Sequence, residues 1–157
     1  MAIEKVREFF RQRNMEDRIR EFDVSSATVE LAAQAIGCEP NRIAKSLAFK
    51  VNDKAILVVA SGDAKVDNLK YKAEFAVKAK MLTPDEAVEL VGHAVGGICP
   101  FAIHDEVTVY LDISLKRFQT VFPACGSSNS VMELTLAELE TFSNYSKWID
   151  VCKAWQV

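Results

Sequence analysis

The run Ala55 to Ser61 constrains the fold more than any other segment, because it is apolar on both faces of a strand until its last residue. Half-exposed strands alternate apolar and polar residues, whereas strands covered on both sides are apolar throughout. The preceding run, Ile43 to Val51, is also of β type, and Asn52-Asp53-Lys54 between the two predicts a hairpin with a turn of about three residues. We therefore expect a central strand that is reached through a hairpin.

Helical periodicity and capping residues predict helices on both sides of this hairpin. Apolar residues recur at helical spacing from Ile3 to about Arg13, and Ser25 or Ser26 can cap a second helix that ends at Ile36 before Gly37. The other predicted helix starts are Asp67, Thr83 with Glu86, and Thr135 with Glu138. Shorter strands are predicted at residues 19–23, 78–82, 107–111, 120–124 and 131–134. Hairpins interspersed with helices favour an α+β fold with a mixed sheet over a regular βαβ array.

Size and composition favour one domain over residues 1–157. Half of the residues are apolar, which is enough for a core without metals or disulfides. No window approaches ~18 consecutive apolar residues, and the N-terminal segment mixes charges into a helical pattern, so we expect a cytoplasmic protein without a membrane segment or signal peptide. The cysteines are irregularly spaced and only two histidines accompany them, so we expect reduced, buried thiols and no metal site.

The distribution of charge leaves two interpretations open. The net charge of -3 disfavours broad, non-specific adhesion to nucleic acid, which needs many phosphate contacts at once. Basic residues nevertheless concentrate between Arg42 and Lys80, whereas acidic residues gather from Asp85 onward. Such a charge run is commonly only a solvated face. The alternative is a basic rim around a site for an RNA end.

Lys45 is the most informative single residue. Side chains alternate along a strand, so Lys45 shares one face with Ile43, Leu47 and Phe49 and interrupts an otherwise bulky apolar surface. Its ammonium group either reaches water at the margin of the sheet or is desolvated beside a site for an anion. Spacing alone is compatible with both.

Two loops that contain glycine are the next candidates. The segment His93 to Phe101 has no periodic pattern and contains Gly96-Gly97-Ile98-Cys99-Pro100. Adjacent glycines let the backbone approach a ligand closely, and their amides can donate to a carbonyl oxygen that gains charge during hydrolysis. Residues 124–128 place a turn of small residues after a strand, where hydroxyls and amides can face a pocket. Each loop, taken alone, is also compatible with a plain turn.

Taken together and in this order, these segments resemble the YbaK/ProX family of aminoacyl-tRNA editing proteins. A lysine after an isoleucine-led turn, a Gly-x-x-x-Pro loop and a late glycine are jointly specific, although each is weak alone. The resemblance extends from about Thr28 to Leu139. The segments that carry it are residues 31–37, 43–47, 58–63, 92–101, 112–115 and 124–126.

The resemblance implies a mixed, mostly antiparallel, barrel-like sheet surrounded by helices, and hydrolysis of the ester between a small amino acid and the CCA end of tRNA. It further implies attack by water, helped by backbone amides and by a ribose hydroxyl of the substrate, with no cofactor or metal. The expected partners are aminoacyl-tRNA and, as a further candidate, an aminoacyl-tRNA synthetase. The expected site residues are Lys45, Gly96 and Gly97 for catalysis, and Ile98, Pro100, Gly126, Ser127 and Ser128 for substrate binding.

Two other functions are compatible with the residues. Cys125 can act as a nucleophile with His93 or His104 as its base. The fold can also serve as a non-catalytic module that binds an RNA end or a nucleotide. The chain departs from common family patterns at Asp23 to Thr28, where a histidine is frequent, and at Cys99 inside the glycine-proline loop. Both departures border the expected pocket, so the identity of the amino acid stays open.

Overall fold

The central strand of the sheet is β3 (Lys54–Ser61), which confirms the expectation for the doubly apolar run. In the computed structural model, which describes residues 2–156, every residue of β3 except Lys54 is buried. β3 pairs with β2 (Ile43–Val51) on one side and with β5 (Thr108–Asp112) on the other. The six-stranded sheet has the order β8-β6-β2-β3-β5-β9, with β6 at Thr120–Pro123, β8 at Leu134–Thr135 and β9 at Lys147–Ile149.

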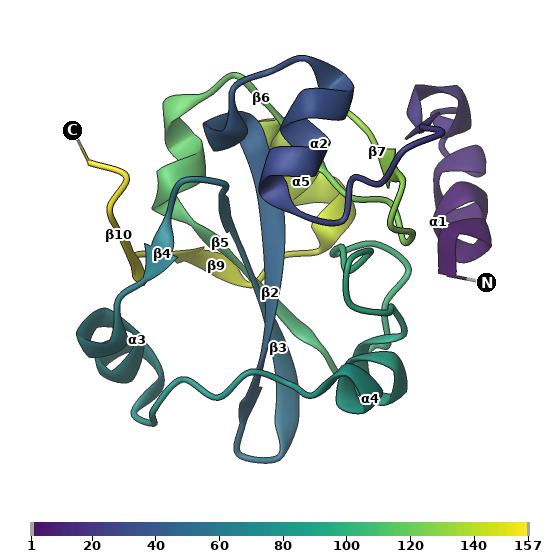
Figure 1. Cartoon of the computed structure of the whole chain (residues 1–157). Coiled ribbons are helices and arrows are strands. Elements are labelled where there is room, and N and C mark those ends of the chain that lie inside the picture. Colours follow the sequence, from purple (N-terminus) through teal and green to yellow (C-terminus); the bar gives the residue numbers. More distant parts are fainter. Residues whose placement is uncertain (1, 157) are drawn as a thin grey trace.

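The sheet is mixed and curls into a half-barrel with helices around it (Figure 1). The β2–β3 and β6–β8 pairs are antiparallel, whereas the β2–β6, β3–β5 and β5–β9 pairs are parallel. Two short antiparallel pairs lie outside this sheet: β1 (Arg20–Glu21) with β7 (Ser130–Val131), and β4 (Lys65–Val66) with β10 (Cys152–Lys153). The predicted α+β class is thus confirmed.

Helices surround the sheet and begin largely at the predicted caps. They are α1 (Ala2–Arg11), α2 (Val29–Ile36), α3 (Asn68–Phe75), α4 (Pro84–Glu86) and α5 (Leu136–Ser143). Short 3-10 helices occupy Glu16–Arg18, Pro40–Arg42 and Ile113–Arg117, and the π-helical turn Ala87–Val91 continues α4. Asp67, Thr83 and Thr135 cap their helices as expected. Within residues 2–156, no helix combines the length and apolar character needed to cross a membrane.

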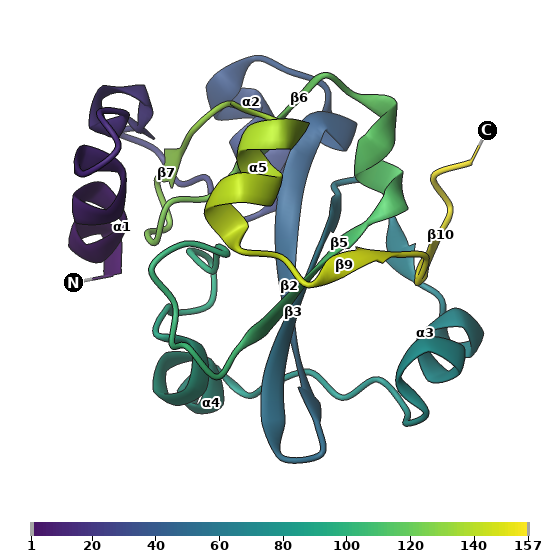
Figure 2. The same ribbon diagram turned by 180° about the vertical axis from the view of Figure 1, so that it is seen from behind.

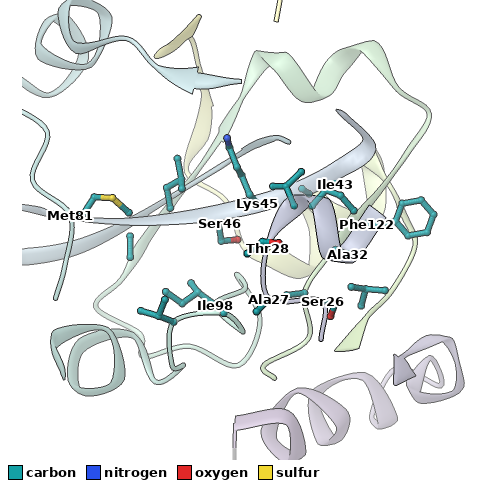
Figure 3. A pocket seen from close by; sticks show the side chains of 18 of the residues that line it. Ser26, Ala27, Thr28, Ala32, Ile43, Lys45, Ser46, Met81, Ile98 and Phe122 are labelled. Atoms are coloured by element: carbon teal, nitrogen blue, oxygen red, sulfur yellow. The ribbon is translucent and has the colours of Figure 1, made fainter. Parts of the chain in front are cut away.

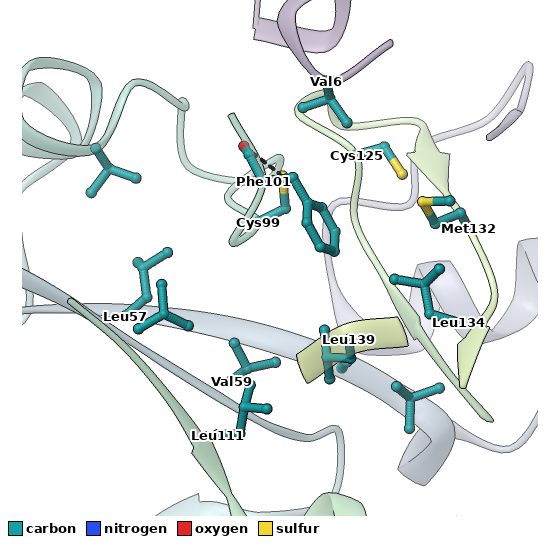
Figure 4. Packing of buried hydrophobic residues seen from close by; sticks show 14 of the residues in the cluster. Val6, Leu57, Val59, Cys99, Phe101, Leu111, Cys125, Met132, Leu134 and Leu139 are labelled. Atoms are coloured by element: carbon teal, nitrogen blue, oxygen red, sulfur yellow. Dashed lines mark hydrogen bonds between the residues drawn. The ribbon is translucent and has the colours of Figure 1, made fainter. Parts of the chain in front are cut away.

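Alternate residues of β3 supply a hydrophobic core on each face of the sheet. Leu57 and Val59 pack in the larger core together with α1, α5 and Phe101 (Figure 4). Ile56 and Val58 pack in the other core, together with α3 and β10. Seen from behind, α5 and α3 lie on opposite sides of the strands (Figure 2). The side chains of β2 alternate between the same two sides.

The hairpin turn between β2 and β3 has two residues, not the predicted three, because Lys54 pairs with Val51 inside the ladder. Asn52 and Asp53 form the turn, and both have positive φ, at 51° and 65°. Two successive left-handed residues match the twist of a hairpin, and Asn and Asp tolerate this conformation better than most residues.

The predicted cap of α2 is also corrected. The N-cap is Thr28, whose side chain accepts a hydrogen bond from Leu31 N at 3.2 Å, so the helix begins later than a cap at Ser25 or Ser26 requires. The Ser25 hydroxyl instead accepts from Ala27 N at 3.1 Å and shapes the loop before the helix. A hydroxyl that serves a tight turn cannot also cap a helix that starts further along.

Several short strands differ from the prediction because pairing depends on tertiary neighbours. The strand predicted at 19–23 shrinks to β1, and the one predicted at 131–134 is split between β7 and β8, which pair with different strands. Residues 78–82 make a single bridge, between Met81 and Phe49, because the capping box of α4 follows directly.

Candidate active site

The outer edge of β2 is covered at both ends and open between them. β6 pairs with Ile43 and Ala44 at the start of the strand. Further along, Lys50 N donates to Lys80 O at 2.9 Å, and Ala48 O accepts from Leu82 N at 3.0 Å. Neither neighbour reaches residues 45–47, so the sheet has a gap at this edge.

A pocket of about 300 Å³ opens at this gap. Its walls are the start of α2, the loop at residues 95–98, and the end of β6, and most of its lining is apolar (Figure 3). The side chains that bring polar groups to it are those of Ser26, Thr28, Lys45 and Ser46. This volume lies at the small end of the range for ligand pockets, which suits a compact organic group.

Lys45 lies beside the pocket and its ammonium group is held by main-chain carbonyls. Its Nζ donates to Gly62 O at 3.4 Å and to Ala64 O. The Lys45 side chain is half-buried, and this desolvation lowers the pKa of the amine. The ammonium group is thus only partly exposed to water, and it forms no ion pair with a carboxylate of residues 2–156, so it is available to an anion.

The turn that holds Lys45 is itself fixed. Gly62 packs so closely on the Pro40 carbonyl that a Cβ has no room there. The next residue, Asp63, accepts from Arg117 through both carboxylate oxygens, at 2.7 and 3.0 Å. The guanidinium of Arg117 and the hydroxyl of Ser61 hold the pKa of Asp63 below its usual value despite partial burial. Lys45 therefore has a rigid set of acceptors.

The two glycines of the 93–101 loop face different surroundings. Gly96 lines the pocket with φ at +97°, a conformation that favours glycine. Gly97 does not line it: its N–H donates to Ala94 O at 3.0 Å, and a Cβ there would lie 2.7 Å from Ser127 N. Ile98 returns to the pocket wall. Among residues 2–156, no acceptor is found for the amides of Gly96 and Ile98.

The 126–128 turn lies behind the pocket and supports its walls. Gly126 has φ at +91° and packs against α1, where a Cβ would lie 3.0 Å from the Ala2 carbonyl. The Ser127 hydroxyl bonds to its own turn, at 2.9 Å from Asn129 Oδ1. Ser128 O accepts from Ser26 N at 2.7 Å and so anchors the loop before α2.

The structure therefore divides the predicted site residues into two groups. Lys45, Gly96 and Ile98 line the pocket, whereas Gly97, Pro100, Gly126, Ser127 and Ser128 do not.

Comparison with known proteins places the chain in a family. Residues 23–142 match the model of the aminoacyl-tRNA editing domain. The chain belongs to the aminoacyl-tRNA editing domain family. An uncharacterized protein of Bacillus subtilis (strain 168), YwhH, is 55% identical over 157 residues, covering 99% of this chain and 100% of that protein.

Two further relatives are described in terms of prolyl-tRNA synthetase. Proline--tRNA ligase of Geobacillus sp. (strain WCH70) is 31% identical over 102 residues, which are 64% of this chain and 18% of the ligase. A crystal structure described as a candidate trans-editing enzyme for prolyl tRNA synthetase superposes with a TM-score of 0.86 at 28% identity, covering 97% of each chain.

Part of the pocket of this editing domain was not predicted from the sequence. Met81 and Phe122 come from separate segments and carry no local signal, whereas Ala27 lies in the segment Asp23 to Thr28 that was expected to border the pocket. Ser46 carries a local signal, because it follows Lys45 on a strand. However, only the pairing of β2 with its neighbours shows that the edge of β2 is free at Ser46. A site formed by convergence of distant segments requires the tertiary structure.

The alternative with Cys125 as nucleophile is contradicted by the geometry of the editing domain. Both Cys125 and Cys99 are fully buried in the larger core, and burial raises the pKa of Cys99 to about 12 and that of Cys125 well above its usual value (Figure 4). The imidazole of His93 lies 2.8 Å from Phe101 O and 3.4 Å from Cys99 Sγ. Buried, protonated thiols of this kind are poor nucleophiles.

Proposed function

We propose that this editing domain is a free-standing hydrolase that removes wrongly attached small amino acids from tRNA. The observation that carries the proposal is the pocket at the gap in β2, which places Lys45 on one face of the strand and the Gly96 to Ile98 loop opposite the other. The family of the chain and the description of its structural relative support an editing role.

The proposed reaction needs no protein nucleophile. Water attacks the ester carbonyl carbon, the bond from that carbon to the ribose oxygen breaks, and the proton lost by water ends on the ribose oxygen. An aminoacyl ester is already activated, so positioning the water and stabilising the oxyanion suffice, with help from the neighbouring ribose hydroxyl. In this scheme Gly96 and Ile98 supply the loop amides, because the amide of Gly97 is committed to Ala94.

Lys45 binds the phosphate-rich CCA end in this proposal. Its ammonium group is partly desolvated and held only by neutral carbonyls, so an incoming phosphate oxygen supplies the missing negative charge. Charge-assisted bonds of this kind are about twice as strong as neutral ones. The lysine thereby fixes the end of the substrate while the ester lies in the pocket.

The small apolar pocket suits a second sieve. A synthetase cannot strongly reject a smaller or nearly isosteric amino acid, since one methylene is worth only about 1 to 3 kcal/mol. A pocket of about 300 Å³ suits a compact aminoacyl group of this kind. The proposed partners are the CCA end of aminoacyl-tRNA and, because a proline--tRNA ligase carries a similar segment, a synthetase that supplies the mischarged product. We place this activity in the cytoplasm.

The test is the release of labelled amino acid from a panel of correctly and wrongly charged tRNAs. We expect the wild type to hydrolyse one or a few esters, and Lys45→Ala to lower that rate by on the order of 100-fold or more. Lys54→Ala is the matched control, since it removes an exposed lysine at the hairpin end of the same sheet.

Each result has a distinct meaning. Loss of turnover in Lys45→Ala with wild-type rates in Lys54→Ala supports the deacylase. Binding of tRNA by the wild type without hydrolysis of any ester contradicts it and identifies the non-catalytic module instead.

A further inference from the structure

Ser46 presents both of its main-chain polar groups to the pocket. Along a strand, the N–H and C=O groups of alternate residues point to the same edge. The bonds of Ala48 and Lys50 to the 80–82 segment show that even-numbered residues of β2 point away from β3. Ser46 therefore directs its N–H and C=O into the gap, where β6 and the 80–82 segment do not reach.

No group of the described chain uses these positions. In the β2–β3 ladder Ser46 lies opposite Val59 with its N–H and C=O turned away from β3, and the pairing of β2 with β6 ends at Ala44. Outside the strand ladders, no hydrogen bond within residues 2–156 involves Ser46 N or Ser46 O, and the Ser46 hydroxyl also lacks a partner although solvent does not reach it. Nearly all main-chain N–H and C=O groups in folded proteins are paired, with other protein groups, with water or with a ligand. A gap one residue long, flanked by paired residues and lined by a pocket, indicates a ligand that completes the ladder.

An aminoacyl ester has the groups that fit. It carries a donor and an acceptor on one residue, the α-ammonium and the ester carbonyl. In an antiparallel ladder, two opposite residues exchange both of their hydrogen bonds in the same way. Building on the proposed function, we propose that the aminoacyl group docks on Ser46 as a one-residue β-bridge. The ammonium donates to Ser46 O, and Ser46 N–H donates to the ester carbonyl.

This docking determines where the side chain of the amino acid lies. Residues opposite one another in a ladder place their side chains on the same face of the sheet. The amino-acid side chain therefore lies on the Ser46 face, toward Ala27 and Ile98, whereas Lys45 extends from the opposite face (Figure 3). The same bridge positions Ser46 N–H on the carbonyl oxygen that becomes negative during hydrolysis.

The bridge also defines the substrate class. It requires an acyl group with a free α-amine, so an α-amino acyl ester binds and its deaminated counterpart binds poorly. The amine recognised at Ser46 O is common to all amino acids. Selection among them is left to the small surfaces at Ala27 and Ile98.

The first experiment removes the Ser46 amide without removing the carbonyl. Ser46→Pro lacks the N–H, and because this group points away from β3, proline breaks no bond of the β2–β3 pair. Ser46→Ala is the matched comparison, since it loses the hydroxyl and keeps the amide. We expect kcat/KM of Ser46→Pro to fall by about tenfold or more below that of Ser46→Ala, on an ester that the wild type hydrolyses. Thermal unfolding of both variants checks that the fold persists.

The second experiment measures binding and does not depend on turnover. The probes are two 3′-amino-3′-deoxyadenosine amides, one acylated with alanine and one with lactic acid, in which a neutral hydroxyl replaces the charged α-ammonium group. We expect the wild type to bind the lactyl compound about tenfold more weakly, and Ser46→Ala to retain this preference because it keeps the carbonyl.

Equal affinity of the wild type for the two amides overturns the inference, as do equal rates for Ser46→Pro and Ser46→Ala. The proposed function fails differently, by absence of hydrolysis of every ester in the panel. A preference for the alanyl amide without any turnover would support the β-bridge at Ser46 and contradict only the proposed hydrolase activity.

Discussion

Gly96 and Gly97 are adjacent in the chain, yet only Gly96 faces the pocket. The absence of a side chain at Gly97 lets the 93–101 loop pack directly on the backbone of Gly126 and Ser127. A Cβ at Gly97 would lie 2.7 Å from Ser127 N and 2.8 Å from the Gly126 carbonyl carbon, and backbone atoms cannot give way as the end of a side chain can. Substitution at Gly97 therefore acts on loop packing before it acts on ligand approach.

We expect Gly97→Ala to lower the free energy of unfolding by about 1 to 3 kcal/mol and to lower deacylation as the pocket wall shifts. Urea denaturation and the tRNA panel measure the two effects. Gly37→Ala is the control, since its Cβ would meet nothing within 4 Å and only the positive φ is penalised. Full stability of Gly97→Ala would contradict the close approach of the two loops.

At the scale of elements, Glu138 links the start of α5 to the 3-10 helix Glu16–Arg18. Glu138 closes the capping box with Thr135, and its carboxylate accepts from Arg18 at 2.7 and 3.0 Å. The hydrogen bond from Arg18 lowers the pKa of Glu138 to about 2, from an ordinary value of 4.5. A lowered carboxylate pKa adds stability above pH ~4.5, and this stability is lost as the pH falls toward ~2.

We therefore expect Glu138→Gln to unfold more easily than the wild type at neutral pH. The difference between the two should shrink as the pH falls from ~4.5 toward ~2, because the wild-type carboxylate becomes protonated. Thermal unfolding across this range measures it. Glu89→Gln, at an exposed position of the π-helical turn, is the control. A difference that stays constant with pH would show that the charge of Glu138 contributes nothing.

The sequence predicts elements well where local chemistry decides them. The central strand and the capping boxes at Thr83 and Thr135 follow from patterns within a few residues, and all are observed. The splitting of residues 131–134 into two short strands depends on which distant strand each half meets. No local pattern contains that information.

The same distinction applies to the pocket. The sequence predicts Lys45 because it interrupts an apolar face, and Gly96 because it belongs to a pair of adjacent glycines in a segment without a periodic pattern. The gap at Ser46 could not be predicted from the sequence, because it exists only where β6 and the 80–82 segment stop short of each other.

At the scale of the whole molecule, the negative net charge hides a local excess of lysine near the pocket. Lys78 and Lys80 are exposed on the segment between α3 and α4, which continues into Met81 of the pocket lining (Figure 1). Within residues 2–156, neither forms an ion pair, whereas Lys50 pairs with Glu86 and Lys70 with Asp150. Lysines without an ion pair beside the pocket suit contacts with phosphate if a tRNA end binds there as proposed.

Reversal of both charges, Lys78→Glu with Lys80→Glu, should raise KM for charged tRNA by about tenfold at low salt and leave kcat nearly unchanged. The effect should weaken as salt increases, because screening removes the contribution that the lysines make in the wild type. Steady-state kinetics at several salt concentrations measure both. Lys54→Glu, at the hairpin, controls for charge reversal of an exposed lysine away from the pocket, and an equal rise of KM there would contradict a local contact.

The two faces of β2 also bear on how such a protein diverges after gene duplication. Lys45 extends from one face, and Ala27 and Ile98, which meet the amino-acid side chain in the proposed docking, lie on the other. In this proposal, separate residues carry separable traits. Mutations at Ala27 or Ile98 can retune which error is corrected while the lysine and its carbonyl cradle are inherited unchanged, so a single ancestral scaffold can give rise to paralogues with different substrates.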